Sequence, residues 1–157
     1  MSGATMSGGV LWQRWLDPAT EYCFTKIEAG NAPEEGHELP AVPKFLDYAP
    51  DQDRVAPLAP EVAAAIEIAS FVRYAASSDS YGVTPLDFAP RPNSLARSWF
   101  PDALLDGHLA ALAALQQDDG GWPVAWEPPT EDAHRAWRGI QTLAAITTLV
   151  AYVKAQD

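Results

Sequence analysis

The last quarter of the chain is predicted to form one long helix that is apolar around most of its circumference. Thr130 is a residue type that favours the N-cap, and Glu131 and Asp132 follow in the first turn, where carboxylates interact well with the helix dipole. The pattern continues to about Val153. Its apolar positions are spread over more than one face: Ala133, Trp137, Ile140, Leu143, Ala144, Ile146, Leu149, Val150 and Val153. Such a helix should lie inside an assembly of helices, so we expect an all-α fold.

Two further helices are expected before it. Residues 60–74 begin with a proline at the first helical position and repeat apolar residues at helical spacing. Ile68 and Phe71 add a second apolar face, so this helix should be largely buried. Residues 101–119 give another helix, which Gly120 and Gly121 should end. The last hundred residues contain no convincing strand pattern.

The N-terminal part is less regular. Residues 1–9 are rich in Gly and Ser and are expected to be a disordered tail. In the segment that follows, Trp12 and Trp15 should be buried, and Pro18 should end the first element. The segment 19–29 fits a strand or a helix, and we favour the helix.

Length and charge exclude several classes of protein. The 157 residues suit one domain, here 10–157. The chain has 21 Asp and Glu against 10 Lys and Arg, a formal charge of −11, which repels phosphate and argues against nucleic-acid binding. The longest uncharged apolar stretch, 139–153, is shorter than the roughly 18 residues that a membrane span requires. No secretory signal is visible, so we expect a cytoplasmic protein.

The cysteine and the histidines do not predict a metal site. Cys23 is the single cysteine, and we expect a small side chain in an apolar environment rather than a nucleophile. His37, His108 and His134 are too far apart in sequence to pair at helical spacing. We therefore expect neither a metal nor a cofactor.

The segment Gln116-Gln117-Asp118-Asp119-Gly120-Gly121-Trp122 joins the last two predicted helices. A glycine supplies the left-handed conformation that ends a helix, and a Gln amide can bond the backbone groups left free. Trp122 can fold back over the helix end as a large apolar lid. The segment therefore predicts a hairpin of two helices.

This segment resembles the QW repeat of the terpenoid cyclase and protein prenyltransferase superfamily of α/α toroids. The resemblance covers roughly residues 104–152, with a degenerate echo at 79–82. Residues 81–88 and 121–129 also resemble the C-terminal part of longer bacterial proteins that carry this repeat. The resemblance implies antiparallel helical hairpins that form part of a toroid, with long irregular loops, around an aromatic cavity for an isoprenoid chain.

The sequence departs from the catalytic patterns of that superfamily. Asp51-Gln52-Asp53-Arg54 lacks the last Asp of the Asp-x-Asp-Asp motif with which class II cyclases protonate their substrate. Asp118-Asp119 has no third Asp for the magnesium motif of class I enzymes, and Cys23 alone does not supply the zinc ligands of the prenyltransferases. If the chain is an enzyme, the resemblance implies a terpene cyclase-like isomerase or lyase without an intact Asp-x-Asp-Asp motif.

Candidate site residues lie in or beside the two long loops, 75–98 and 122–129. Loops at one end of a helical barrel often form the mouth of its cavity. The candidate acids are Glu127, held between Trp126 and two prolines, and Asp119; either could instead be an ordinary solvated carboxylate. Residues that could line an apolar pocket, or simply plug helix ends, are Tyr81, Asp87, Trp99, Trp122 and Trp126. Asp87 could also tie to Arg91 or Arg97.

Two functions are favoured. The first is a terpenoid cyclase-like helical protein that binds an apolar, isoprenoid-type small molecule, with acid–base cyclisation or isomerisation by Glu127 or Asp119. The second is a non-catalytic interaction module that completes its fold as a homodimer, because helices apolar on two faces in so short a chain must find partners. A carbohydrate-active α/α barrel is a weaker third reading, since it needs a defined pair of carboxylates.

Overall fold

The structure is a computed structural model that describes residues 8–30, 36, 38–76 and 82–155. Within these ranges the chain forms α1 (Gly8–Glu28), α2 (Ala41–Tyr48), α3 (Gln52–Ile68), α4 (Pro85–Phe88), the 3₁₀ helix η1 (Leu95–Trp99), α5 (Asp102–Ala114) and α6 (Glu131–Lys154). The described residues form no β-sheet and only one isolated bridge, between Val72 and Val83. The expected all-α class is confirmed.

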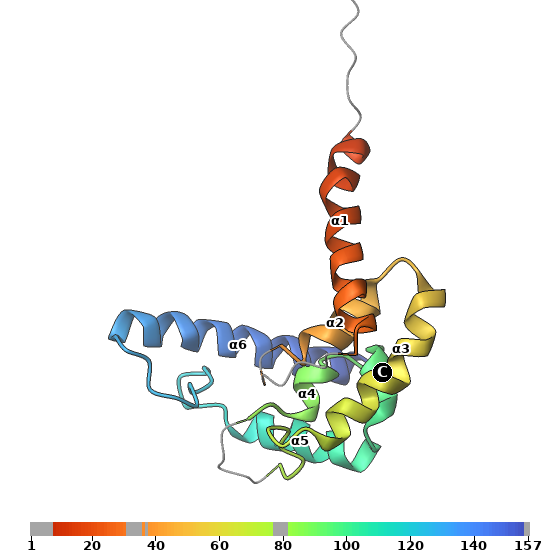
Figure 1. The fold of residues 1–157 in the computed structure, drawn as a ribbon. Helices are drawn as coiled ribbons and strands as arrows, with labels where there is room; N and C mark the ends of the chain where they lie inside the picture. Colours follow the sequence, from red (N-terminus) through yellow and green to blue (C-terminus); the bar gives the residue numbers. More distant parts are fainter. Residues whose placement is uncertain (1–7, 31–35, 37, 77–81, 156–157) are drawn as a thin grey trace, which may run out of the picture.

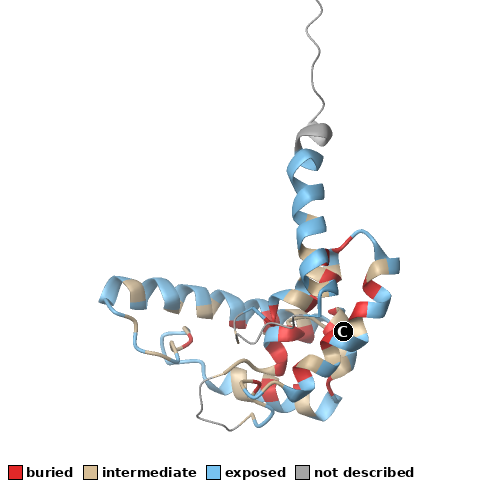
Figure 2. Ribbon diagram, in the orientation of Figure 1, coloured by how far each residue is buried: buried red, intermediate tan, exposed pale blue. Residues whose placement is uncertain are grey.

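The elements α2 to α5 and η1 form a small body, from which the two longest helices extend in different directions (Figure 1). α1 leaves the body at its C-terminal end. α6 packs on the body with its C-terminal half, while its N-terminal half and the loop before it reach outward. Figure 2 shows that the buried residues gather in the body and that most of α1 and α6 is exposed.

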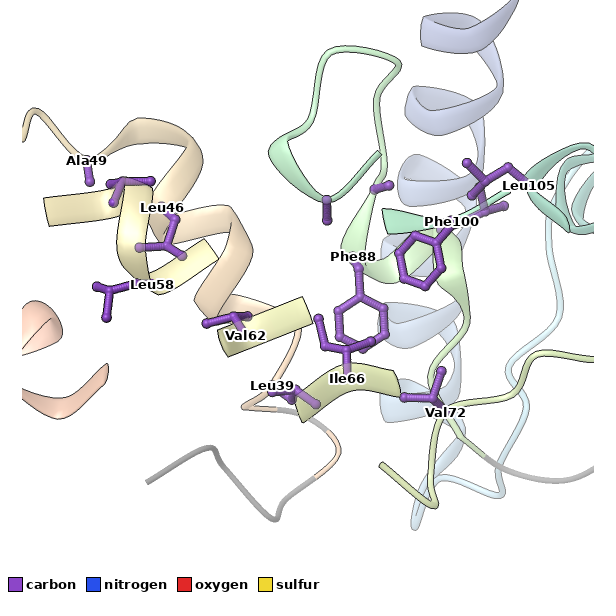
Figure 3. Packing of buried hydrophobic residues seen from close by; sticks show 14 of the residues in the cluster. Leu39, Leu46, Ala49, Leu58, Val62, Ile66, Val72, Phe88, Phe100 and Leu105 are labelled. Carbon is purple, nitrogen blue, oxygen red and sulfur yellow. The ribbon is translucent and has the colours of Figure 1, made fainter. Parts of the chain in front are cut away.

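The core is one apolar cluster that lies between the short elements. Phe88 from α4 and Phe100, just after η1, have ring centroids 6.0 Å apart, and Ile66 from α3 and Leu105 from α5 are buried with them (Figure 3). Tyr152 joins α6 to this cluster, and its hydroxyl donates a hydrogen bond to the Ala89 carbonyl over 2.8 Å.

α1 differs from the expectation in two ways. It runs unbroken through Pro18, and the first two predicted elements are one helix. The expectation that Trp12 and Trp15 are buried is wrong, because they are 64% and 55% exposed. Only the C-terminal end of α1 contacts the body, where Phe24 is buried against Phe45. Of the predicted tail, Gly8 and Gly9 belong to α1 and the other residues lie outside the described ranges.

α1 is attached to the body by one arginine of α3. Arg54 donates hydrogen bonds to the carboxylates of Glu21 and Glu28, two turns apart on α1, with the shortest distances 2.7 and 2.8 Å. These bonds lower the pKa of both carboxyls. The Arg54 guanidinium also lies 4.1 Å from the centre of the Phe24 ring, a cation–π arrangement.

α3 covers residues 52–68, whereas the predicted helix covered 60–74, so it begins and ends earlier than predicted. Asp51 caps it by accepting a hydrogen bond from the Arg54 backbone N–H, and Pro57 and Pro60 lie inside the helix. Both prolines are exposed, so water can bond the carbonyls that they leave free. After Ile68 the backbone turns and pairs with residues near Gly82 instead of continuing as a helix.

Two expectations about burial in the helices are also wrong. Ile68, expected on a buried second face of α3, is 85% exposed, because no residue in the described ranges covers it. α6 has the predicted bounds and N-cap, but it does not lie inside a helical assembly. Only one side of it is packed, with Ala145, Thr148 and Tyr152 as its buried residues.

We predict that Leu105→Ala lowers the free energy of unfolding by about 2–5 kcal/mol, because Leu105 has no exposed surface and its loss leaves a cavity. Leu115→Ala, at a position that is 55% exposed, should change it by less than about 0.5 kcal/mol. Urea unfolding followed by circular dichroism measures both. Equal losses in the two variants would contradict the position of the core.

Candidate functional site

The turn between α5 and α6 has the geometry that the sequence predicts. Gly120 adopts a φ of 85°, which favours glycine, and the side-chain amide of Gln116 donates to the Gly120 carbonyl over 3.0 Å. The Gln117 N–H donates to the Gly121 carbonyl over 2.9 Å. α5 itself ends at Ala114, before the glycines, so they shape the turn rather than end the helix.

Trp122 is the lid of this turn and is 5% exposed. Its indole N–H donates over 2.7 Å to the Leu112 carbonyl, which also accepts from the Leu115 backbone N–H at the end of α5. Its backbone N–H donates to the Thr142 hydroxyl over 3.0 Å. Trp122 therefore joins α5 to the middle of α6, which is a structural role.

Asp119, one of the two candidate acids, forms an ion pair with Arg138 of α6. The hydrogen bond from Arg138, together with one from the Gly121 N–H, lowers the pKa of the Asp119 carboxyl. Arg138 also donates to the Gln117 amide oxygen over 2.9 Å. A carboxylate held in its ionised form suits a structural tie better than proton donation at neutral pH.

Glu127, the other candidate acid, lies on an open pocket of about 550 Å³ before the N-terminal end of α6. Trp126 also lines this pocket, and its ring meets the Trp137 ring edge-on with centroids 5.1 Å apart. Its remaining lining residues are Val124, Ala125, Pro128, Thr130, Glu131 and His134. Glu127 and Trp126 are thus the two candidates that one pocket brings together.

The other candidates lie elsewhere. Trp99 is half-buried against the body core, and Tyr81 lies outside the described residues. Asp87 caps its own helix: it accepts from the Thr84 backbone N–H over 2.7 Å and from the Thr84 hydroxyl over 2.9 Å. Of the possible roles for Asp87, the tie to Arg91 or Arg97 is not formed, because the carboxylate closes a capping box with Thr84. The arginines pair instead as Arg91 with Asp47 and Arg97 with Asp102.

The described part of the chain holds no cluster of metal-ligating side chains and no membrane-spanning helix. Within it, no three His, Cys, Asp or Glu side chains gather closely enough to hold an ion. None of the helices in these ranges has the length and hydropathy of a membrane span.

Sequence reasoning missed the buried His108 and the exposed side of α6. His108 is 4% exposed, and its Nε2 lies 3.0 Å from the Tyr74 carbonyl. The exposed side of α6 carries large apolar residues: Trp137, Ile140, Leu143, Ile146, Val150 and Val153. The absence of charge over 139–153 was the available signal for an apolar surface there.

Comparisons of the chain with protein-family models, with curated proteins and with solved structures find no match. The resemblance to the α/α toroids therefore stays a prediction.

We predict that Trp122→Phe lowers the free energy of unfolding by about 0.5–1.5 kcal/mol, because it removes the indole hydrogen bond that links the loop to the Leu112 carbonyl. The matched change Trp126→Phe, in the open pocket, should have a smaller effect. Urea unfolding monitored by circular dichroism compares them. A larger loss for Trp126→Phe would contradict the role of Trp122 as the link between α5 and α6.

We also predict a pH dependence for the Asp119–Arg138 pair. Because the folded-state pKa of Asp119 is lowered from 3.8, its contribution to stability is present above that value and is lost as the pH falls through the folded-state pKa. Asp119→Asn should therefore lower Tm at pH 7, and the difference from wild type should shrink below about pH 4. Thermal unfolding from pH 7 to pH 3 measures this. The exposed neighbour Asp118, changed to Asn, is the control, and a pH-independent difference for Asp119→Asn would contradict the prediction.

Proposed function

We propose that this protein is a helical interaction module that buries the exposed side of α6 against a second copy of itself. One observation carries the proposal: α6 packs on the body mainly with small and polar side chains and directs most of its large aliphatic side chains to water. The packed side includes Thr148 and Tyr152, which are buried, and Gln141, which is half-buried. On the exposed side, Leu143 is 68% and Val153 is 60% exposed.

The size of this apolar surface suits association of moderate strength. The main residues on it are Ile140, Leu143, Ile146, Val150 and Val153, each between 43% and 68% exposed. Completing the burial of such a side chain contributes about 1 kcal/mol, so five on each of two copies give on the order of 10 kcal/mol. Association itself costs about 4–15 kcal/mol, so α6 alone is close to the threshold for a stable dimer.

α1 offers a second apolar surface that could add to the first. Trp12, Trp15, Leu16 and Tyr22 are all exposed and recur at helical spacing, and the Trp12 and Trp15 rings meet edge-on with centroids 5.8 Å apart. Contiguous exposed apolar side chains on this scale are typical of interaction sites rather than of free surfaces. The α/α-toroid resemblance also favours self-association, because a complete toroid needs more helices than this chain supplies.

A small apolar ligand is the second candidate function, and the pocket that brings Trp126 and Glu127 together supports it. An aromatic wall beside a carboxylate suits acid–base chemistry on an apolar substrate. The pocket is open to solvent, so an apolar ligand in it would stay partly in water, and this function ranks below self-association.

The test is native mass spectrometry with sedimentation velocity at two protein concentrations. We expect a dimer whose fraction rises with concentration, and also with added salt, which screens the repulsion between copies of charge −11. Leu143→Glu should shift the protein to monomer by placing a charge in the interface. A wild-type monomer at every concentration would overturn the proposal, and retained extra mass would favour the ligand.

The matched control is Ala56→Glu, which adds the same charge at a position away from α6. Ala56 is exposed on α3 and belongs to neither the α6 nor the α1 apolar surface. It should leave the dimer fraction nearly unchanged. Equal loss of dimer in both variants would mean that net charge, rather than this surface, controls association.

A further inference from the structure

We infer that two copies of α6 pair antiparallel, with Leu143 of one copy opposite Ile146 of the other; this inference rests on the proposed self-association. The exposed residues Ala136, Gly139, Leu143, Ile146, Val150 and Val153 are separated alternately by three and four positions. That alternation is the spacing of the seam along which two helices pack in a coiled coil. Over these two and a half repeats the seam contains no charged residue.

Side-chain size along the seam favours the antiparallel direction. The N-terminal positions are small, Ala136 and Gly139, while the later ones are Leu, Ile and Val. Parallel pairing would place Gly139 opposite Gly139 and leave a gap, which interiors packed at protein density avoid. The antiparallel register that sets Leu143 opposite Ile146 also sets Gly139 opposite Val150 and Ala136 opposite Val153, so each small residue meets a large one.

A groove at Gly139 leaves room for the partner's side chains. It has a volume of about 450 Å³ and lies along α6, lined by Gly139, Thr142, Leu143 and Ile146 with Arg135 and Arg138 at its edge. Both arginines are paired within their own copy, Arg135 with Asp132 and Arg138 with Asp119. The groove therefore offers an apolar floor with neutralised charges beside it, which suits a valine from the second copy.

The charges at the two ends of α6 favour the same direction. Its first turn carries Glu131 and Asp132, and its last turn carries Lys154. Antiparallel pairing in this register sets Lys154 level with Arg135 and about one turn from Asp132 of the other copy, and it opposes the two helix dipoles. Parallel pairing would bring like charges together at each end.

Disulfide cross-linking tests the direction and register. All proteins carry Cys23→Ser to remove the native thiol, and one then carries Ala136→Cys and another Val153→Cys. In the inferred register, position 136 of one copy faces position 153 of the other. The two positions 136 lie about 25 Å apart, and so do the two positions 153, because 17 residues of helix rise by about 1.5 Å each. A disulfide needs Cα atoms within about 7 Å. Mild oxidation of the mixture should therefore give a dimer with one chain of each kind, and either protein alone should give little.

The controls separate this inference from the proposed function. Ala144→Cys, exposed but off the seam, should not cross-link, and circular dichroism checks that each variant is folded. Cross-linking of each single variant with itself would show parallel pairing and overturn the inference. A dimer in sedimentation without any of these cross-links would overturn it too, leaving self-association through another surface such as α1. A monomer in sedimentation would overturn both.

Discussion

The attachment of the two longest helices to a small core governs the rest of this structure. The core is confined to the short elements between α2 and α5, and it reaches α1 through Phe24 and α6 through Tyr152. Each long helix therefore has one well-buried region and a long stretch with little behind it. A larger core would have hidden Trp12 and Leu143, whereas here those side chains lie in water.

The polarity of α6 follows from where it is attached. Its packed side meets backbone as well as side chains: the Tyr152 hydroxyl bonds the Ala89 carbonyl, and the Thr142 hydroxyl accepts from the Trp122 N–H. Polar residues are suited to that side because buried polar backbone groups need partners. Apart from Ala145 and Leu149 on the packed side, most aliphatic residues of α6 lie on the opposite side, so a helix can be well placed in the fold and still expose an apolar surface.

Local signals in the sequence predicted local structure well. Thr130 caps α6 and Gln116 and Trp122 build the turn because each acts on backbone within a few residues or across one hairpin. Expectations that depended on distant packing were wrong: Pro18 does not end α1, Trp12 and Trp15 are exposed, and α3 ends at Ile68. Helical spacing shows that residues share a face, but it does not say whether anything lies against that face.

In the candidate site, too, neighbours in sequence were predictable and partners from elsewhere in the fold were not. Trp126 and Glu127 are adjacent in sequence, so their shared pocket was foreseeable, while Asp87 and Asp119 were already engaged by partners, Thr84 and Arg138, that spacing alone did not reveal. Aromatic and acidic residues in loops are therefore poor evidence for a common site until their hydrogen bonds are known.

Hydrogen bonds at Thr142 and Tyr152 bracket most of the apolar stretch of α6, and Arg138 ties the helix to Asp119 as well. A helix that is held at several points along its length is already ordered in the monomer. It therefore loses little conformational entropy when a partner binds. α1, held only near Phe24, keeps more freedom and would lose more of it on docking. Of two surfaces with similar chemistry, the one on α6 is therefore the better prepared to bind.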